Sequence, residues 1–179
     1  EFSPVGDAPG EPGNIVLVHD FTTPLEDFST YLGQIDGKPV MYGDAVWRMR
    51  FFITEESNWG LNWNTAGPNE LGDITTSQSS YTISFTTGRR INVGRQIFDA
   101  NVERYWDYGK PDLADNVLIL EPGVWHYLEI ATYQGQVQVW LDGQGIVDVI
   151  DEYPLPAGAF SLGGASGGIQ YFDAISVCG

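Results

Sequence analysis

The side chains best suited to recognising a ligand lie within residues 125–143, which read WHYLEIATYQGQVQVWLDG. Tyr127, Glu129, Gln138 and Trp140 alternate there with aliphatic residues. Alternate residues of an extended strand share a face, so this spacing gathers rings, an amide and a carboxylate on one side. A planar ring covers the apolar face of a sugar, and fixed polar groups bind its hydroxyls. The spacing therefore indicates a saccharide-binding surface.

The same stretch predicts a β-hairpin whose two faces differ. With Gln134 and Gly135 as the central turn residues, the cross-strand pairs follow from counting along the chain. His126 then falls on the core side, as a buried histidine rather than a catalytic base. The expected core pairs are Thr132–Val137, Ile130–Val139 and Leu128–Leu141, and the expected outer pairs are Ala131–Gln138 and Glu129–Trp140, flanked by Tyr127 and Tyr133.

Guanidinium groups and amides occupy the less apolar side of other expected strands. If these sides join one concave sheet, they form a polar groove with Trp140 at its floor, in which the guanidinium groups bind sugar hydroxyls. Two alternatives remain open: Trp140 packs as a structural residue, or the arginines pair with Glu129 or another carboxylate. The residues concerned are Arg48, Arg50, Asn62 and Asn64.

A second candidate surface lies in residues 97–116, which are acidic, aromatic and irregular. A loop of this length within a compact domain is either functional or contains a short strand. Tyr105 and Trp106 in this segment would extend a sugar platform if they lie at the rim. Alternatively, Trp106 folds down over the core.

Composition limits the partners of this chain of 179 residues. Its net charge is −16, with only eight Lys and Arg against 24 Asp and Glu. So few cations argue against nucleic acid and anionic membrane surfaces as partners. No apolar run is long enough to span a bilayer, and the single Cys178 excludes an internal disulfide. The acidic surface either aids solubility or holds calcium through some of its carboxylates.

Short alternating segments with intervening turn residues predict an all-β protein. They include residues 45–53, 59–64, 81–86, 90–96, 116–121 and 145–150, which indicate a β-sandwich or a barrel. Residues 1–13 are rich in Pro, Gly and acids and are expected to be a linker or a surface arm. Residues 14–179 are then one domain.

The order of motifs resembles the concanavalin A-like lectin and glucanase jelly-roll superfamily over about residues 15–177. The segments that carry the resemblance are GDAVWRMRFFI, WGLNWN, YTISFTTGRRINVGRQ, PGVWHYLEIATYQGQVQVWLDG, PAGAFSLGG and GIQYFDAISV. It implies a two-sheet antiparallel β-sandwich, similar to non-catalytic carbohydrate-binding modules of secreted bacterial proteins. Location outside the cell, fusion to further domains and an oligo- or polysaccharide partner are expected. Calcium is common in this superfamily, and the resemblance points to Asp20 and Asp173 as ligands, or to a structural hydrogen bond of Asp173.

Glucanase chemistry on this fold uses a Glu followed two positions later by Asp, and no such pair occurs here. Glycoside hydrolysis needs two carboxylates, and Glu129 has no clear partner on its face. Only Glu103 or Asp107 in the long loop could reach it. We therefore expect a carbohydrate-binding domain. The alternatives are an adhesion or sensor domain of a larger extracellular protein that binds a protein partner, and a jelly-roll glycoside-cleaving enzyme.

Overall fold

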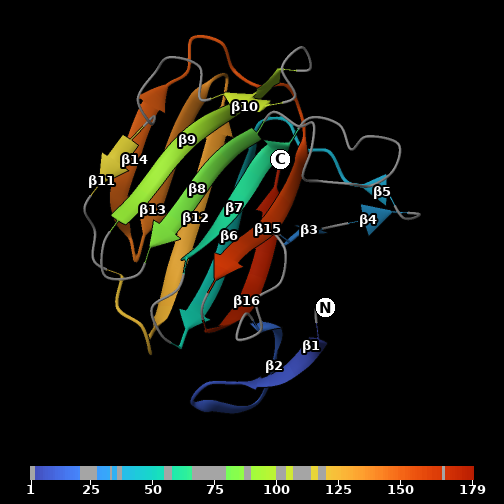
Figure 1. Cartoon of the computed structure of the whole chain (residues 1–179), viewed down its shortest axis with the longest axis vertical. Helices are drawn as coiled ribbons and strands as arrows, with labels where there is room; N and C mark the ends of the chain where they lie inside the picture. Colours follow the sequence, from blue (N-terminus) through green and yellow to red (C-terminus); the bar gives the residue numbers. More distant parts are fainter. Residues whose placement is uncertain are drawn as a thin grey trace.

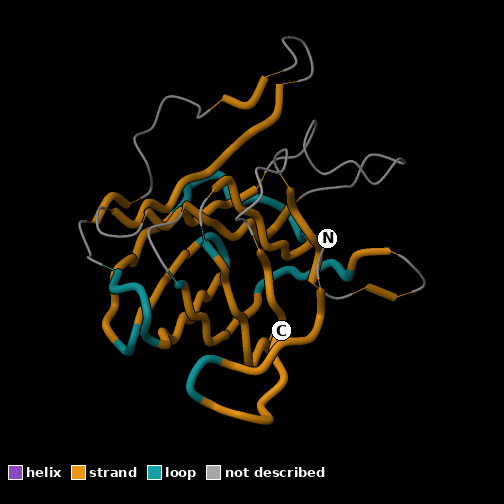
Figure 2. The backbone as a smooth tube through the Cα atoms, turned by 60° about the horizontal axis from the view of Figure 1, so that its bottom comes forward, coloured by secondary structure: helices purple, strands orange, loops and turns teal. Residues whose placement is uncertain are grey.

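The computed structural model describes residues 3–20, 28–32, 34–35, 38–54, 58–65, 80–86, 90–99, 104–106, 114–116, 120–166 and 168–179. Within these ranges every regular element is a β-strand, as Figure 2 shows. The described residues contain no helix long and apolar enough to cross a membrane. The prediction of an all-β protein is confirmed.

The strands form two large antiparallel sheets that lie against each other (Figure 1). The first sheet has the order β1 (Ser3–Ala8), β2 (Glu11–Asp20), β16 (Ile169–Cys178), β6 (Ala45–Ile53), β12 (Trp125–Tyr133), β13 (Gln136–Leu141) and β14 (Gln144–Ile150). The second has the order β10 (Arg104–Trp106), β9 (Arg90–Asp99), β8 (Ser80–Thr86), β7 (Asn58–Thr65), β15 (Ala159–Ser166) and β3 (Phe28–Leu32), and β11 (Ala114–Asn116) also pairs with β9. The short strands β4 (Gln34–Ile35) and β5 (Lys38–Pro39) form a separate pair.

Strand alternation places the core between the two sheets. Along β6, buried residues alternate with half-buried ones, so one face of the strand is removed from water. Trp47 of β6 stacks on Phe160 of β15 with ring centroids 5.7 Å apart, and Phe51 contacts Phe85 of β8 at 5.5 Å. These rings join the first sheet to the second. The predicted two-sheet antiparallel β-sandwich is therefore confirmed.

The hairpin of residues 125–143 has the predicted register. All five expected cross-strand pairs between β12 and β13 are present. Gln134 and Gly135 both have positive φ, at 47° and 85°, as a tight two-residue hairpin turn requires. His126 is buried, as expected for the core side.

The N-terminal segment is more regular than its composition indicates. Residues 1–13, expected to be a linker or surface arm, include β1 and the start of β2, which pair as a hairpin. β2 then pairs with β16, so this hairpin extends the first sheet (Figure 1).

The segment expected to be a long loop also contains strands. β9 continues to Asp99, and β10 and β11 pair with it. Of the strand expected over 116–121, Asn116 is the last residue of β11, and Leu120 and Glu121 lie outside any strand. Residues 117–119 lie outside the described residues, so the rest of this expectation stays a prediction.

Candidate functional site

Six of the ten predicted ligand-binding residues lie on the outer face of the first sheet, on three adjacent strands. We call the outward side chains of β6, β12 and β13 the Trp140 face. Its half-buried and exposed positions alternate with the buried core positions of the same strands. The six residues are Arg48, Arg50, Tyr127, Glu129, Gln138 and Trp140.

The centre of the Trp140 face is one row across the three strands. Arg48 pairs with Glu129 in the β6–β12 ladder, and Glu129 pairs with Trp140 in the β12–β13 ladder. The Arg48 Nε donates a hydrogen bond to the Glu129 carboxylate, and this bond raises the pKa of Arg48. The two side chains stay 38% and 27% exposed, so water and solutes reach the pair. The row therefore offers a ring beside fixed hydrogen-bonding groups.

A β-bulge sets the neighbour of Trp140. The β13–β14 register shifts between Val139 and Trp140, so that Trp140 lies opposite Gly145 and Ile146 is the extra residue. A Cβ on Gly145 would lie 3.5 Å from both Cδ1 and Nε1 of the indole. Trp140 therefore lies close against the backbone of Gly145 and is half-buried. Glycine leaves this side of the indole free of a competing side chain.

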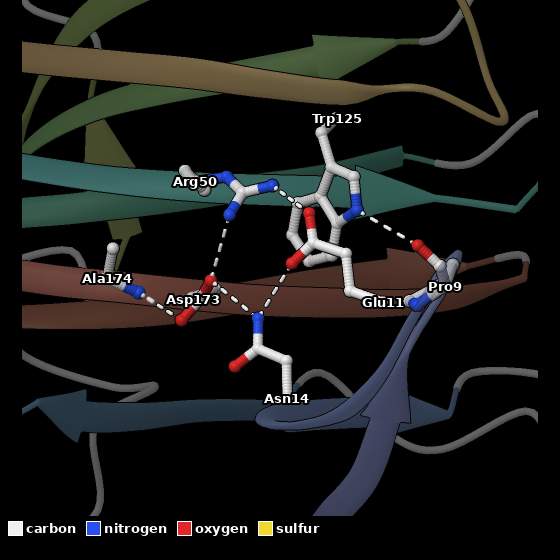
Figure 3. A network of polar contacts seen from close by, with 7 residues as sticks. All are labelled: Pro9, Glu11, Asn14, Arg50, Trp125, Asp173 and Ala174. Carbon is white, nitrogen blue, oxygen red and sulfur yellow. Dashed lines mark hydrogen bonds and ion pairs between the residues drawn. The ribbon is translucent and has the colours of Figure 1, made fainter.

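Arg50 is bound by the N-terminal hairpin (Figure 3). Its guanidinium donates to Glu11 Oε1 at 2.7 Å and to Asp173 Oδ2 at 3.2 Å, and lies 4.6 Å from the ring centroid of Trp125. The hydrogen bond from Arg50 lowers the pKa of Glu11, and Asn14 adds to this effect. Glu11 in turn raises the pKa of Arg50. Arg50 thus fastens the hairpin to the sheet.

The N-terminal hairpin also contacts the aromatic residues at this end of the sheet. The Trp125 Nε1 donates to the carbonyl oxygen of Pro9 at 3.2 Å (Figure 3). Trp125 also contacts Phe52, which contacts Tyr171. Sequence reasoning missed Glu11 and Asn14, because a segment without periodicity gives no sign of where it lies. The abundance of acidic residues around few arginines was the only available signal.

The asparagines do not join this face. Asn62 and Asn64 lie on β7, which pairs with β8 and β15 in the second sheet, so the prediction of one groove containing them was wrong. Strand alternation shows which side of a strand is buried, but not which sheet the strand enters. Asn64 is also buried, with φ at 49°, and donates to the carbonyl oxygen of Pro156 at 3.1 Å. Its role is structural.

Tyr105 and Trp106 lie on β10, opposite Phe98 and Ile97 of β9. This strand belongs to the second sheet, away from the Trp140 face. The side chains of Tyr105 and Trp106 lie outside the described residues, so their part in binding stays a prediction.

The predicted pair of calcium ligands is separated along β16. Asp20 lies opposite Ile169, whereas Asp173 lies four positions further on. The Asp173 carboxylate accepts hydrogen bonds from Asn14, Arg50 and the Ala174 amide (Figure 3). These donors do not fit a cation held by Asp173, and they match the structural alternative. No group of three or more metal-binding side chains occurs in the described ranges, and calcium elsewhere stays a prediction.

Comparison of the sequence with protein-family models and with curated proteins found no match. Solved structures do resemble this chain. The carbohydrate-binding module CBM66 from Bacillus subtilis matches with TM-score 0.64 and 9% identity over 98% of this chain and 91% of that one. A Bacillus subtilis protein of unknown function with a galectin-like fold matches with TM-score 0.66 and 13% identity, over 99% and 87%. A variant of human galectin-16 matches with TM-score 0.54 and 11% identity, over 89% and 99%. The chain therefore has a lectin-like β-sandwich fold.

Proposed function

We propose that this protein is a carbohydrate-binding domain that binds a glycan on the Trp140 face. The observation that carries the proposal is the row Arg48–Glu129–Trp140, in which a half-buried indole stands beside an accessible ion pair. The indole would cover the apolar face of a sugar ring. The ion pair would bind the hydroxyls at the ring's edge.

The ion pair supports this function because it holds its own polar groups in place. In the described contacts, Arg48 donates to Glu129 through Nε. The other N–H donors of its guanidinium group are then available to ligand hydroxyls. Groups that are already ordered lose little freedom when a ligand binds, so more of the interaction energy appears as affinity. Arg50 offers fewer free donors, because Glu11 and Asp173 already engage both of its terminal nitrogens.

The fold supports the same function class. The structures that resemble this chain include a protein named as a carbohydrate-binding module and a galectin variant. Their identities to this chain are low, so they say nothing about which face binds. An adhesion or sensor role, location outside the cell and fusion to further domains stay predictions of the sequence.

Affinity electrophoresis through gels that contain soluble β-glucan, xylan, mannan or fructan tests the proposal. We expect at least one polysaccharide to retard the protein, and Trp140→Ala to weaken that retardation about tenfold. Glu129→Gln should weaken it several-fold with little change in unfolding midpoint, because an exposed ion pair contributes little to stability.

Asn62→Ala and Ser84→Ala are the matched controls, since both residues lie on the second sheet. These variants should migrate as the parent protein does. If they lose retardation while Trp140→Ala keeps it, the glycan binds the second sheet and our assignment of the face is wrong. If no gel retards the parent protein, the proposed function is wrong.

A further inference from the structure

A line of outward side chains runs along β13 from Trp140 toward the hairpin turn. Gln136, Gln138 and Trp140 occupy alternate positions, each half-buried, with buried valines between them. Tyr133 lies opposite Gln136 and is 63% exposed. The line therefore begins at one aromatic residue and ends at another.

The two ends of this line are too far apart for one sugar unit. An antiparallel strand rises about 3.4 Å per residue, so the four steps from Trp140 to Gln136 span about 14 Å. Tyr133 lies in the row of Gln136. A disaccharide does not reach across this distance, whereas a longer chain lying along the strand does.

Polar groups at the Tyr133 end of the line are held in place. The Gln136 Nε2 donates to Asp148 Oδ1 at 2.7 Å, and the Gln134 Nε2 donates to the Tyr133 hydroxyl at 3.2 Å. Gln138 lies opposite Ala131. The small side chain of Ala131 projects little from the sheet, so the surface beside Gln138 is open. A sugar unit could thus lie between the rings without displacing a large side chain.

Charge selects among the possible glycans. The chain carries net charge −16. The Asp44 carboxylate lies at the Tyr133 end, where it accepts a hydrogen bond from the backbone amide of Gln134. Asp148 lies opposite Gln138, in the middle of the line, and its carboxylate accepts a hydrogen bond from the Gln136 side chain. Arg48, at the Trp140 end, is already neutralised by Glu129. An acidic polysaccharide would meet repulsion here that a neutral one does not.

On the basis of the proposed function, we propose that the ligand is an extended neutral oligosaccharide, longer than a disaccharide, lying along β13 between Trp140 and Tyr133. Trp140 and the Arg48–Glu129 pair bind one end. Tyr133 covers a sugar unit further along the chain, and Gln136 and Gln138 bind the hydroxyls between.

Titration calorimetry with gluco-, xylo-, manno- and fructo-oligosaccharides, from disaccharide to hexasaccharide, tests this arrangement. For the sugar that binds, affinity should rise with length and level off beyond the tetrasaccharide or pentasaccharide. Tyr133→Ala should lower affinity for the hexasaccharide about tenfold and leave the disaccharide unchanged. Tyr133→Phe keeps the ring and should bind as the parent does. Trp140→Ala should weaken binding at every length.

Each contrary outcome has a distinct meaning. Equal affinity for all lengths, or a hexasaccharide affinity that Tyr133→Ala does not change, overturns the extended site and leaves the proposed function intact. Binding of oligogalacturonate as tight as that of the neutral series overturns the choice of a neutral ligand. If no oligosaccharide binds, both this proposal and the proposed function fail.

Discussion

Glu11 and Arg50 join the N-terminal hairpin to the middle of the first sheet. The Glu11 carboxylate accepts a hydrogen bond of 2.7 Å from the Arg50 guanidinium, across 39 positions of sequence. The same guanidinium lies over Trp125 and binds Asp173. One arginine therefore connects the hairpin, the last strand and the start of β12.

Removing this carboxylate should loosen the hairpin. In Glu11→Gln, the ion pair with Arg50 is lost while the size of the side chain is kept. We expect amide hydrogen exchange across β1 and β2 to become several-fold faster. Exchange in β12 and β13 should not change, because the hairpin of β1 and β2 can open locally while the rest of the protein stays folded. Glu121→Gln, at an exposed position outside the network, is the control. Unchanged exchange in β1 and β2 would show that the hairpin is held by its strand pairing alone.

The attachment of the hairpin should also depend on pH. The folded state lowers the pKa of Glu11 below its ordinary value of 4.5, mainly through the hydrogen bond from Arg50. The carboxylate therefore stabilises the docked hairpin fully above about pH 4.5, and this contribution disappears as the pH falls through the lowered folded pKa. Amide chemical shifts of β1 and β2, followed by NMR from neutral pH to about pH 2, measure this. The transition should be absent in Glu11→Gln, and a transition that persists there belongs to another group.

A buried polar network should be important for global stability. The Tyr81 hydroxyl donates to Asp151 at 2.8 Å, and Arg95 binds the same carboxylate at 2.8 Å. Burial raises the pKa of Tyr81, so the phenol stays neutral. Tyr81→Phe should cost about 1–3 kcal/mol of unfolding free energy because it removes a partner of a buried carboxylate. Arg95→Met should cost about 3–5 kcal/mol because it leaves that carboxylate without its cation.

Urea unfolding of the two single variants and of Arg95→Met combined with Asp151→Leu measures these costs. The combined variant should be more stable than Arg95→Met alone, since no unpaired buried charge remains. If Arg95→Met is as stable as the parent protein, the Arg95–Asp151 ion pair does not contribute to global stability as predicted.

The turn between β12 and β13 should tolerate no side chain at Gly135. This residue has φ at 85°, and a Cβ there would lie 2.8 Å from the carbonyl oxygen of Asp151. Gly143 also has positive φ, at 78°, but nothing lies within 4 Å of its Cβ position. Gly143→Ala should therefore cost only about 1–2 kcal/mol of backbone strain. Gly135→Ala adds a steric clash and should lower the thermal midpoint further. Equal midpoints of the two variants would contradict the predicted clash.

The parts of the structure that local pattern determines were predictable from sequence. The alternation in residues 125–143 and the turn at Gln134-Gly135 specify the register of β12 and β13, and hence the pairing of Glu129 with Trp140 in the ladder. Pairing of Arg48 with Glu129 was one of two stated alternatives. Glu129 and Trp140 lie in one hairpin, and Arg48 lies on a strand whose outward face its alternation already indicates.

The parts that long-range pairing determines were not predictable. Alternation in β7 gave no indication that Asn62 would enter the sheet opposite Arg48, because sheet membership depends on strands far apart in sequence. Glu11 had no periodicity to reveal its strand. Its contact with Arg50 follows from the docking of a whole hairpin, which no local rule determines.

The extra residue of the β-bulge, Ile146, shifts the inward–outward alternation of β14 by one position. This shift lets Ile146 and Val147 both reach the interior, and it brings Gly145 into step with Trp140. In an unbroken ladder Ile146 would stand beside the indole, and a branched aliphatic group would crowd it. A graft of β13 and β14 onto another scaffold must therefore keep the number of residues between Gln144 and Val147. This number places Gly145 opposite Trp140 and so keeps the indole accessible.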